Sequence, residues 1–323
     1  MPDVLITENI NGAAMDALRA EFDAAFEPDL WKQPDRLFAA VAACRALIVR
    51  NQTKVTRELI AAALKLEIIG RAGVGLDNVD VQAASDHGVV VAFTPEQNTN
   101  SVAELVIGMI LSLARMIPAA DRDTKQGGWN RQRFTGTEII GRTLGLVGLG
   151  RIGLCTAAKA RALGMEIMAY DPYVDPEGLG PMQIRAQMRG LDDVLAQSDF
   201  ISCHLPATKD TIGLFSYERF CRMKPGAYFI NTARGDVLNE EGLLQALREN
   251  KIAGAALDVR AQEPPAPGPL TELDKVILMP HVGAFTVEGQ TRVVNAVCHD
   301  VAAVLRGKPA RNFANFNRPA AKS

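Results

Sequence analysis

The stretch Gly145-Leu146-Val147-Gly148-Leu149-Gly150-Arg151-Ile152-Gly153 decides the fold of the second half of this chain. It continues an apolar, strand-like run, and its three glycines have the G-x-G-x-x-G spacing that opens a helix. Such glycines permit a tight turn and let the backbone approach a pyrophosphate, while the helix N-terminus offers free N–H groups to the phosphates. A second apolar run ends at Asp171, 18 residues after Gly153, where an acid would bind the adenosine ribose hydroxyls. The motif alone would also fit an ordinary loop, but with this context it predicts dinucleotide binding.

The same acid indicates which dinucleotide binds. A carboxylate at Asp171 accepts hydrogen bonds from both ribose hydroxyls of NAD but repels the 2′-phosphate of NADP. Pro172 follows directly, so no adjacent cation offsets that repulsion. The sequence therefore predicts NAD as the cofactor.

Bulk composition narrows the class of protein. At 323 residues the chain is long for one core, which favours two domains. Hydrophobic residues make up 48% and charged residues 22%, and the formal net charge of −2 offers no basic surface for nucleic acid or a membrane. No apolar run reaches a membrane span and the N-terminus lacks an export signal. The five cysteines and four histidines show neither disulfide nor metal-ligand spacing, so we expect a cytoplasmic protein without a metal.

Strand and helix patterns alternate twice along the chain, which predicts two parallel sheets covered by helices. The first hundred residues give strands at 4–6, 46–49, 67–69 and 89–93, with helices at 13–22 and 56–64. From residue 143 there are six strand candidates, at 143–147, 166–169, 200–203, 227–230, 255–259 and 276–278, the number in a full dinucleotide-binding sheet.

Two longer helical patterns connect the sheets. One begins at Ser101, where Ser101 and Glu104 have the spacing of a capping box, and ends at Pro118. The other, at 287–305, is expected to return the chain to the first domain. We therefore predict an α/β protein of two doubly wound parallel-sheet domains. A Rossmann NAD-binding domain (99–286) is inserted in a discontinuous, flavodoxin-like substrate-binding domain (1–98 and 287–323).

Three polar side chains follow neighbouring strands of the second sheet. Ligands of open α/β sheets bind beyond the carboxyl ends of the strands, where Arg234, Glu263 and His281 are expected. Oxidation of an alcohol by hydride transfer needs a base for the hydroxyl proton, and His281 is the natural candidate. Glu263 would fix its tautomer, and Arg234 could hold a substrate carboxylate by a forked pair of bonds. Taken singly, His281 also fits a structural histidine, Glu263 an exposed loop acid and Arg234 a surface cation.

Four motifs together resemble the D-isomer-specific 2-hydroxyacid dehydrogenases over nearly the whole chain. They are Gly148-x-Gly150-x-x-Gly153, Asn231-Thr232-Ala233-Arg234-Gly235, Ala255-Ala256-Leu257-Asp258-Val259 with Glu263-Pro264, and Pro280-His281-Val282-Gly283-Ala284. The resemblance implies that Arg234, Glu263 and His281 are catalytic. It also implies a set of cofactor-binding residues: Gly148, Gly150, Arg151, Ile152, Gly153, Asp171, His204, Pro206, Thr211, Thr232, Ala233 and Asp258.

The first domain carries two further resemblances. The stretch 71–80 resembles the family's carboxylate-binding loop, in which the N–H groups of Val74 and Gly75 would bind the substrate carboxylate; alone it would read as a glycine turn. Val49-Arg50-Asn51-Gln52-Thr53-Lys54-Val55 resembles the phosphoglycerate dehydrogenase branch, here without its C-terminal regulatory domain. In that branch the arginine matching Arg50 helps to bind the distal anionic group.

Several positions depart from that branch. Phe285 replaces a small hydroxyl residue, Arg260 replaces an aromatic one, and Glu96-Gln97 replaces a glycine pair. These changes line or flank the pocket, so 3-phosphoglycerate competes with sulfolactate, glycerate and glyoxylate or hydroxypyruvate as the substrate. Arg260 is either an extra cation for a dianion or a charge that points into solvent, and we favour solvent.

Other classes of function remain open. The superfamily includes NAD(H)-sensing corepressors, against which the intact Arg234, Glu263 and His281 argue, and formate dehydrogenases, against which Glu263 argues. Family members commonly pair through the second domain. The helix from Ser101 and the loop at 129–134 are therefore candidate elements of a homodimer interface, although the helix could also pack wholly within its own core.

Overall fold

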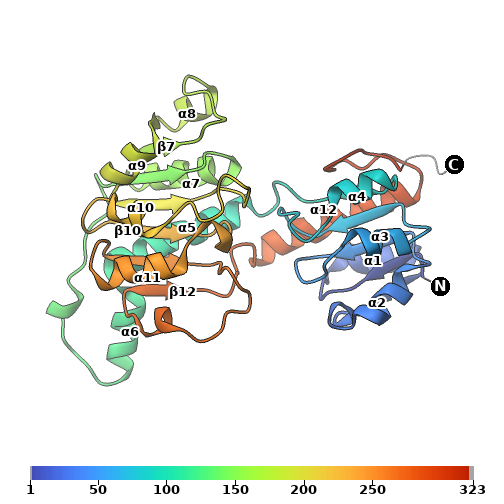
Figure 1. Cartoon of the computed structure of the whole chain (residues 1–323), viewed down its shortest axis with the longest axis horizontal. Helices are drawn as coiled ribbons and strands as arrows, with labels where there is room; N and C mark the ends of the chain where they lie inside the picture. Colours follow the sequence, from blue (N-terminus) through green and yellow to red (C-terminus); the bar gives the residue numbers. More distant parts are fainter. Residues whose placement is uncertain (1, 320–323) are drawn as a thin grey trace. The chain divides into compact units, whose positions relative to one another are not determined.

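The computed structural model describes residues 2–319, and these divide into two compact units (Figure 1). The first combines the residues up to Asn98 with those from Phe285 onward, and the second is the continuous segment Thr99–Ala284. Each unit holds one sheet in which all strand pairs are parallel. The division by itself assigns no role to either unit, so substrate binding by the first stays a prediction.

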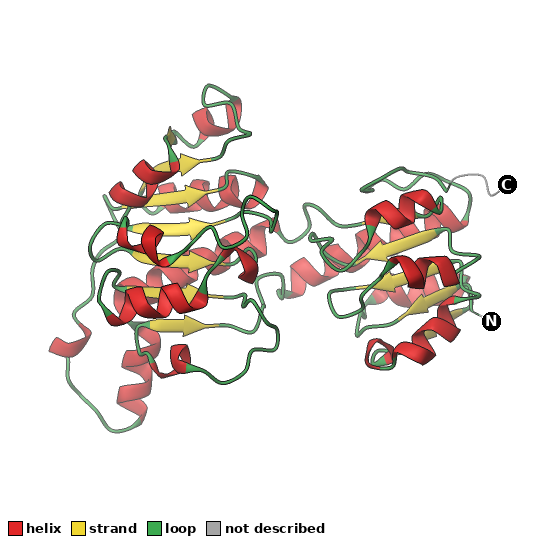
Figure 2. Ribbon diagram, viewed as in Figure 1, coloured by secondary structure: helices red, strands yellow, loops and turns green. Residues whose placement is uncertain are grey.

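The first unit is built on a five-stranded sheet in the order β2-β1-β3-β4-β5, which is the flavodoxin-like order. Helices cover both faces (Figure 2), so the central strands β1 and β3 are buried and apolar throughout. Val4 and Ile6 pack on one face with α1 and α12, whereas Leu5 packs on the other face with α2 and α3. The strands are β1 (Val4–Ile6), β2 (Ala24–Phe26), β3 (Ala46–Val49), β4 (Ile68–Arg71) and β5 (Val90–Ala92). The helices are α1 (Ala13–Glu21), η1 (Leu30–Lys32), α2 (Pro34–Val41), α3 (Arg57–Ala62), α4 (Val81–Asp86) and α12 (Val287–Leu305).

Helix α12 packs on the same face of this sheet as α1 and contacts strand β4 directly. Its residues Val297 and Val301 lie against Gly70 of β4, where a Cβ atom would be 2.8 Å from a methyl group of each valine. Only a residue without a side chain lets the helix approach the strand this closely. Helix α12 is therefore part of the core of the first unit.

The sequence patterns do not predict β2, α2 or α4. Strand β2 has only three residues, all half-buried at the sheet edge, and so shows no apolar periodicity. Helix α4 has six residues and is fixed by a cap, in which the Asp80 carboxylate accepts a hydrogen bond from the Ala83 amide at 2.7 Å. Elements this short depend on tertiary contacts more than on pattern.

The second unit is built on a seven-stranded sheet in the order β12-β11-β10-β9-β6-β7-β8. Counted within the unit, this is the Rossmann order 3-2-1-4-5-6 with one strand added. The strands are β6 (Thr143–Val147), β7 (Glu166–Tyr170), β8 (Gln187–Met188), β9 (Phe200–Cys203), β10 (Tyr228–Asn231), β11 (Gly254–Leu257) and β12 (Val276–Leu278). The α-helices are α5 (Thr99–Arg115), α6 (Ile117–Lys125), α7 (Arg151–Ala162), α8 (Leu179–Gln183), α9 (Leu191–Gln197), α10 (Tyr217–Cys221) and α11 (Glu240–Arg248); the 3₁₀ turns are η2 (Gln132–Phe134), η3 (Gly235–Val237) and η4 (Pro269–Glu272).

Helices α5 and α7 pack on one face of this sheet, and α9, α10 and α11 pack on the other. The predicted fold class of two doubly wound parallel-sheet domains is confirmed. The predicted count of six strands is wrong, because the sequence patterns did not predict the edge strand β8, which pairs with β7. Its two residues, Gln187 and Met188, are too few to give a strand pattern.

The predicted capping box is also wrong. Helix α5 begins at Thr99, so Ser101 and Glu104 both lie inside it, and Glu104 accepts a hydrogen bond from the Asn100 side chain. The helix ends at Arg115 because Met116 adopts a left-handed conformation with φ of 52°, and Pro118 stands in the first turn of α6. Among residues 2–319 no single helix is long and apolar enough to span a membrane, although α5 and α6 pass that test as a pair bent by 61°. The cytoplasmic location stays a prediction.

Candidate active site

The glycine-rich segment forms the turn between β6 and α7. Gly148 has φ of +99°, a left-handed conformation that side chains disfavour, and Gly150 directly precedes the helix. A Cβ on Gly153 would lie 2.6 Å from the carbonyl oxygen of Gly148, whereas a Cβ on Gly150 would meet no atom within 4 Å. The loop is therefore packed on its protein side and open above the N-terminus of α7, as a bound pyrophosphate requires.

Asp171 lies beside this loop at the end of β7. Its Oδ2 accepts a hydrogen bond from the Leu149 amide at 2.8 Å, and its Oδ1 accepts one from the Tyr173 amide at 2.9 Å. The carboxylate is therefore oriented by the glycine loop itself. Each oxygen keeps a second lone pair for a ligand hydroxyl.

His204 stands on the other side of the glycine loop, after β9. A Cβ on Gly148 would lie 3.0 Å from the His204 carbonyl group, so the two segments are in contact. Burial lowers the pKa of His204 to about 4, which keeps the ring neutral at pH 7, and its Nε2 lies 3.0 Å from the Ser202 hydroxyl. Thr211 closes the segment by donating to the Pro206 carbonyl at 2.5 Å.

The segment after β10 is shaped by the fully buried Asn231. Its Nδ2 donates to the Arg234 carbonyl at 2.8 Å and its Oδ1 accepts from the Ala233 amide at 3.0 Å. This local bridge fixes the backbone from which the half-buried Arg234 side chain extends. The neighbouring Thr232 has a buried hydroxyl oxygen with no hydrogen-bond partner among the described residues.

Asp258, after β11, fixes the segment that follows β12. Its carboxylate is 1% exposed and accepts hydrogen bonds from the amides of Val282 and Gly283, both at 2.8 Å. The His281 amide donates to the Asp258 carbonyl at 2.8 Å, and His281 adopts φ of 56°. A positive φ is uncommon for a residue with a side chain, and the contacts with Asp258 hold the backbone of His281 in this conformation.

Glu263 and His281 are in direct contact. Nδ1 of His281 lies 2.7 Å from Oε2 of Glu263, and the Arg260 amide donates to the other Glu263 oxygen at 3.2 Å. Burial raises the pKa of Glu263, but the His281 hydrogen bond and charge, the Arg260 amide and the charge of Arg234 outweigh it and leave that pKa below its usual value. Glu263 is therefore an anion that orients His281 and leaves Nε2 of the ring for other partners.

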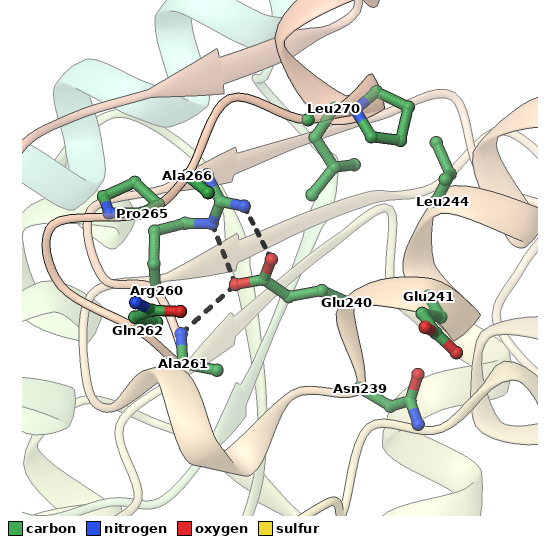
Figure 3. A pocket seen from close by; sticks show the side chains of 12 residues that line it. Asn239, Glu240, Glu241, Leu244, Arg260, Ala261, Gln262, Pro265, Ala266 and Leu270 are labelled. Atoms are coloured by element: carbon green, nitrogen blue, oxygen red, sulfur yellow. Dashed lines mark hydrogen bonds and ion pairs between the residues drawn. The ribbon is translucent and has the colours of Figure 1, made fainter.

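Arg260 does not point into solvent, so that expectation is wrong. Its side chain is 11% exposed and forms a forked ion pair with Glu240, with Nε and Nη2 donating at 2.8 and 2.6 Å (Figure 3). The Arg260 charge is therefore already balanced inside the second unit. It is not a spare cation for a dianionic substrate.

In the first unit, Glu8 fixes the loop that carries Arg50. Glu8 follows β1 and is 4% exposed, and its carboxylate accepts hydrogen bonds from four consecutive backbone amides, those of residues 50–53, at 2.7 to 3.1 Å. Asn78 holds the same loop by donating to the carbonyls of Arg50 and Thr53. The loop after β3 is therefore rigidly held by side chains that are distant in sequence.

The Arg50 guanidinium stacks on Phe285, with 4.1 Å between Cζ and the ring centroid. Phe285 is 56% exposed, so the pair forms part of the surface of the first unit. Burial lowers the pKa of Arg50, and the charge of Glu8 offsets part of that effect. After β4, the amides of Val74 and Gly75 are partly exposed and make no hydrogen bond with any described residue.

Sequence reasoning missed Glu8 and Glu240. Each is an acid whose partners lie 20 to 45 positions further along the chain. Their positions were the only available signal, since Glu8 lies two residues after a buried strand and Glu240 is the first residue of a helix. Nothing local in the sequence distinguishes them from exposed acids.

The residues of the second unit fit a bound dinucleotide. The space above Gly150, the helix N-terminus beneath it, the oriented Asp171 and the unpartnered hydroxyl of Thr232 all lie at the carboxyl edge of one parallel sheet. The Glu263–His281 pair lies at the same edge, after β11 and β12. The fold and the site thus define a nucleotide-binding α/β protein with a carboxylate–imidazole pair at the same sheet edge.

Residues 107–283 match the model of the D-isomer specific 2-hydroxyacid dehydrogenase family, NAD binding domain. The match covers more than half of the chain, and the chain therefore belongs to this family. The predicted family and the predicted dinucleotide-binding nature of the second unit are confirmed.

Individual relatives agree with this assignment. The D-3-phosphoglycerate dehydrogenase of Archaeoglobus fulgidus is 43% identical over 97% of this chain and 59% of its own length, and that of Methanocaldococcus jannaschii is 41% identical over 98% and 60%. The chain spans about three fifths of the length of these relatives. Among solved structures, a glyoxylate/hydroxypyruvate reductase of Sinorhizobium meliloti in complex with NADP and malonate is 30% identical, with a TM-score of 0.88 over 99% of both chains. The D-lactate dehydrogenase of Aquifex aeolicus with NAD and lactic acid is 27% identical, with a TM-score of 0.86 over 97% of this chain and 99% of that one.

Proposed function

We propose that this protein is an NAD-dependent dehydrogenase that interconverts a D-2-hydroxy acid and its 2-keto acid. The observation that carries the proposal is the 2.7 Å contact between Glu263 and His281 at the sheet edge that also bears the glycine loop. The cofactor, when bound, takes up or gives the hydride at C2 of the substrate. The protein then has to move one proton and bind one carboxylate.

His281 is the proposed general base and acid. In the oxidation its Nε2 takes the hydroxyl proton of the 2-hydroxy acid, and in the reduction it returns that proton to the oxygen at C2. Glu263 accepts the hydrogen bond from Nδ1, so Nε2 is left free for the substrate in the tautomer that the reaction needs. The cation of Arg234 is proposed to bind the substrate carboxylate and polarise the C2 oxygen.

For the first unit we propose a substrate-binding role. The amides of Val74 and Gly75, which make no hydrogen bond within the described part of the chain, are suited to a carboxylate. Arg50 is the proposed partner of a distal anionic group, with 3-phosphoglycerate as the first candidate substrate. Because the Arg50 guanidinium is already stacked on Phe285, a smaller or less charged acid, such as glycerate or glyoxylate, is the second candidate substrate.

The experiment is loss of NADH absorbance with a panel of 2-keto acids: 3-phosphohydroxypyruvate, hydroxypyruvate, glyoxylate and 3-sulfopyruvate. His281→Ala should lower kcat at least 100-fold with NADH binding retained, as expected for a lost general acid. His87→Ala, which removes an exposed histidine of α4's C-terminal end, is the matched control and should be unchanged. Tight NADH binding without turnover of any acid by the wild type would contradict the proposal and favour an NAD(H)-sensing protein.

We further propose a homodimer through the second unit. Large apolar side chains are exposed on α5, on α6 and in the segment that follows: Leu111, Ile117, Trp129 and Ile140, at 36%, 50%, 74% and 67%. Exposed apolar groups gathered on one segment are typical of an interface. Light scattering of the wild type should give twice the chain mass of 34.8 kDa, and Trp129→Ser should shift it toward the monomer. A monomeric wild type would refute the dimer.

A further inference from the structure

The loop that carries Glu263 is anchored on its far side by the ion pair of Arg260 with Glu240 (Figure 3). Besides the two guanidinium bonds, the Ala261 amide donates to Oε1 of Glu240 at 3.2 Å. Three N–H groups from two consecutive residues therefore converge on one carboxylate. The two side chains are only 11% and 26% exposed, so the pair is largely shielded from water.

The anchor itself stands on a rigid element. Glu240 is the first residue of α11, and the preceding Asn239 caps that helix by accepting a hydrogen bond from the Gly242 amide at 2.7 Å. A helix N-terminus favours a negative charge. The hydrogen bond from Arg260 lowers the pKa of Glu240 against the opposing effect of burial, so the carboxylate remains charged at neutral pH. The loop is thus tied to the end of a helix by a charged, oriented group.

The backbone of Arg260 connects this anchor to the acid–base pair. Its amide donates to Oε1 of Glu263 at 3.2 Å, and the other oxygen of Glu263 is the one 2.7 Å from His281. Gly235, the residue after Arg234, packs on the same backbone, where a Cβ would lie 2.0 Å from the Arg260 carbonyl carbon. One short segment therefore contacts both the loop of Arg234 and the carboxylate that orients His281.

We propose that Glu240 and Arg260 are positioning residues for the acid–base pair, an inference that rests on the proposed function. Their ion pair fixes the Arg260 amide, the amide fixes Glu263, and Glu263 fixes the tautomer of His281. Neither residue touches the reacting atoms. The proposal also gives a physical reason for an arginine at a position where the family commonly has an aromatic residue.

The kinetic test uses Glu240→Gln, which keeps the side-chain shape and removes the charge. We expect kcat for the preferred 2-keto acid to fall about tenfold, while KM and the NADH dissociation constant stay within twofold of the wild type. Arg260→Lys, which keeps the charge but loses the fork, should lower kcat similarly, and the double variant should be no worse than the more impaired single variant. Glu241→Gln changes an exposed neighbour that lines, with Glu240 and Arg260, the pocket drawn in Figure 3; it is the matched control and should match the wild type.

A second test does not depend on turnover. With only four histidines, the ring ¹⁵N resonances of the whole protein can be assigned, and His281→Ala identifies those of His281. At a pH where the ring is neutral, the wild type should show one tautomer, protonated at Nδ1, and Glu240→Gln should show a mixture. An unchanged His281 spectrum in Glu240→Gln, or a change in KM without a change in kcat, overturns the positioning role. If the wild type reduces no keto acid, the proposed function fails and the NMR result alone decides this inference.

Discussion

Glu8 offers the sharpest test of how the first unit is held together. Its Oε1 accepts hydrogen bonds from the amides of Arg50 and Thr53, and its Oε2 accepts them from the amides of residues 51 and 52. In Glu8→Gln one oxygen becomes an NH₂ group, so two amides lose their acceptor. A hydrogen bond to a charged group contributes roughly 1.5–3 kcal/mol, which gives about 3–6 kcal/mol for two. Because the freed loop can recover water, we expect the free energy of unfolding to fall by about 3 kcal/mol.

Two assays check this value. Urea unfolding gives the stability change, and hydrogen exchange of the amides of residues 50–53 reports the loop itself. Glu27→Gln, which removes an exposed ion pair with Arg36, is the control and should cost less than about 1 kcal/mol. Since Arg50 is carried by this loop, KM for an anionic substrate should also rise in Glu8→Gln while kcat holds. A stability loss no larger than that of the control, with unchanged exchange of the four amides, would refute the reasoning.

Three further predictions concern the second unit. Since burial lowers the pKa of His204 to about 4, the folded state binds fewer protons than the unfolded state between pH 4 and 6.5. The contribution of His204 to the free energy of unfolding should therefore be nearly complete above pH 6.5, and it should fall by about 2 kcal/mol from pH 7 to pH 5. In denaturant titrations, His204→Gln should show a flatter dependence of stability on pH. An identical dependence in the variant would contradict this prediction. Gly153→Ala places a Cβ 2.6 Å from the Gly148 carbonyl, so calorimetry should show a loss of about 1–3 kcal/mol and titration a weaker affinity for NADH; unaltered NADH affinity would show that the loop can shift freely. Asp171→Asn no longer repels a 2′-phosphate, so the preference for NADH over NADPH should shrink about tenfold in kcat/KM, and an unchanged ratio would mean that another group selects the cofactor.

Local patterns predicted the parts of the fold that depend on local chemistry. The helix Val287–Leu305 has the predicted bounds because its apolar stripe runs for five turns and ends before Gly307 and Pro309. The glycine turn between β6 and α7 was predictable because each of its glycines meets a distinct steric demand. The capping box failed because a serine and a glutamate three residues apart also occur inside helices, and α5 begins two residues earlier.

The site was predictable only in outline. The strand order of a doubly wound sheet brings the residues after β11 and β12 to one edge, so the proximity of Glu263 and His281 followed from topology and spacing. The acids that hold these loops could not be found in this way. Glu8 acts through four backbone amides, which carry no residue-specific signal, and Glu240 acts through the Arg260 guanidinium and the Ala261 amide, which lie 20 and 21 positions further along the chain. The prediction that Arg260 points into solvent was wrong for a similar reason, because its partner Glu240 is brought to it by tertiary packing and not by a local pattern.

The place of α12 against β4 has a consequence for synthesis on the ribosome. Strands β1 to β5 are translated before the second unit, but one face of their sheet is covered by valines from residues 293–301 that are made only after that unit. The continuous segment Thr99–Ala284 contains all of its own sheet and can complete its core while the nascent chain still lacks that helix. The sheet whose strands are made before the second unit is therefore completed only after that unit, which reverses the usual order of co-translational folding.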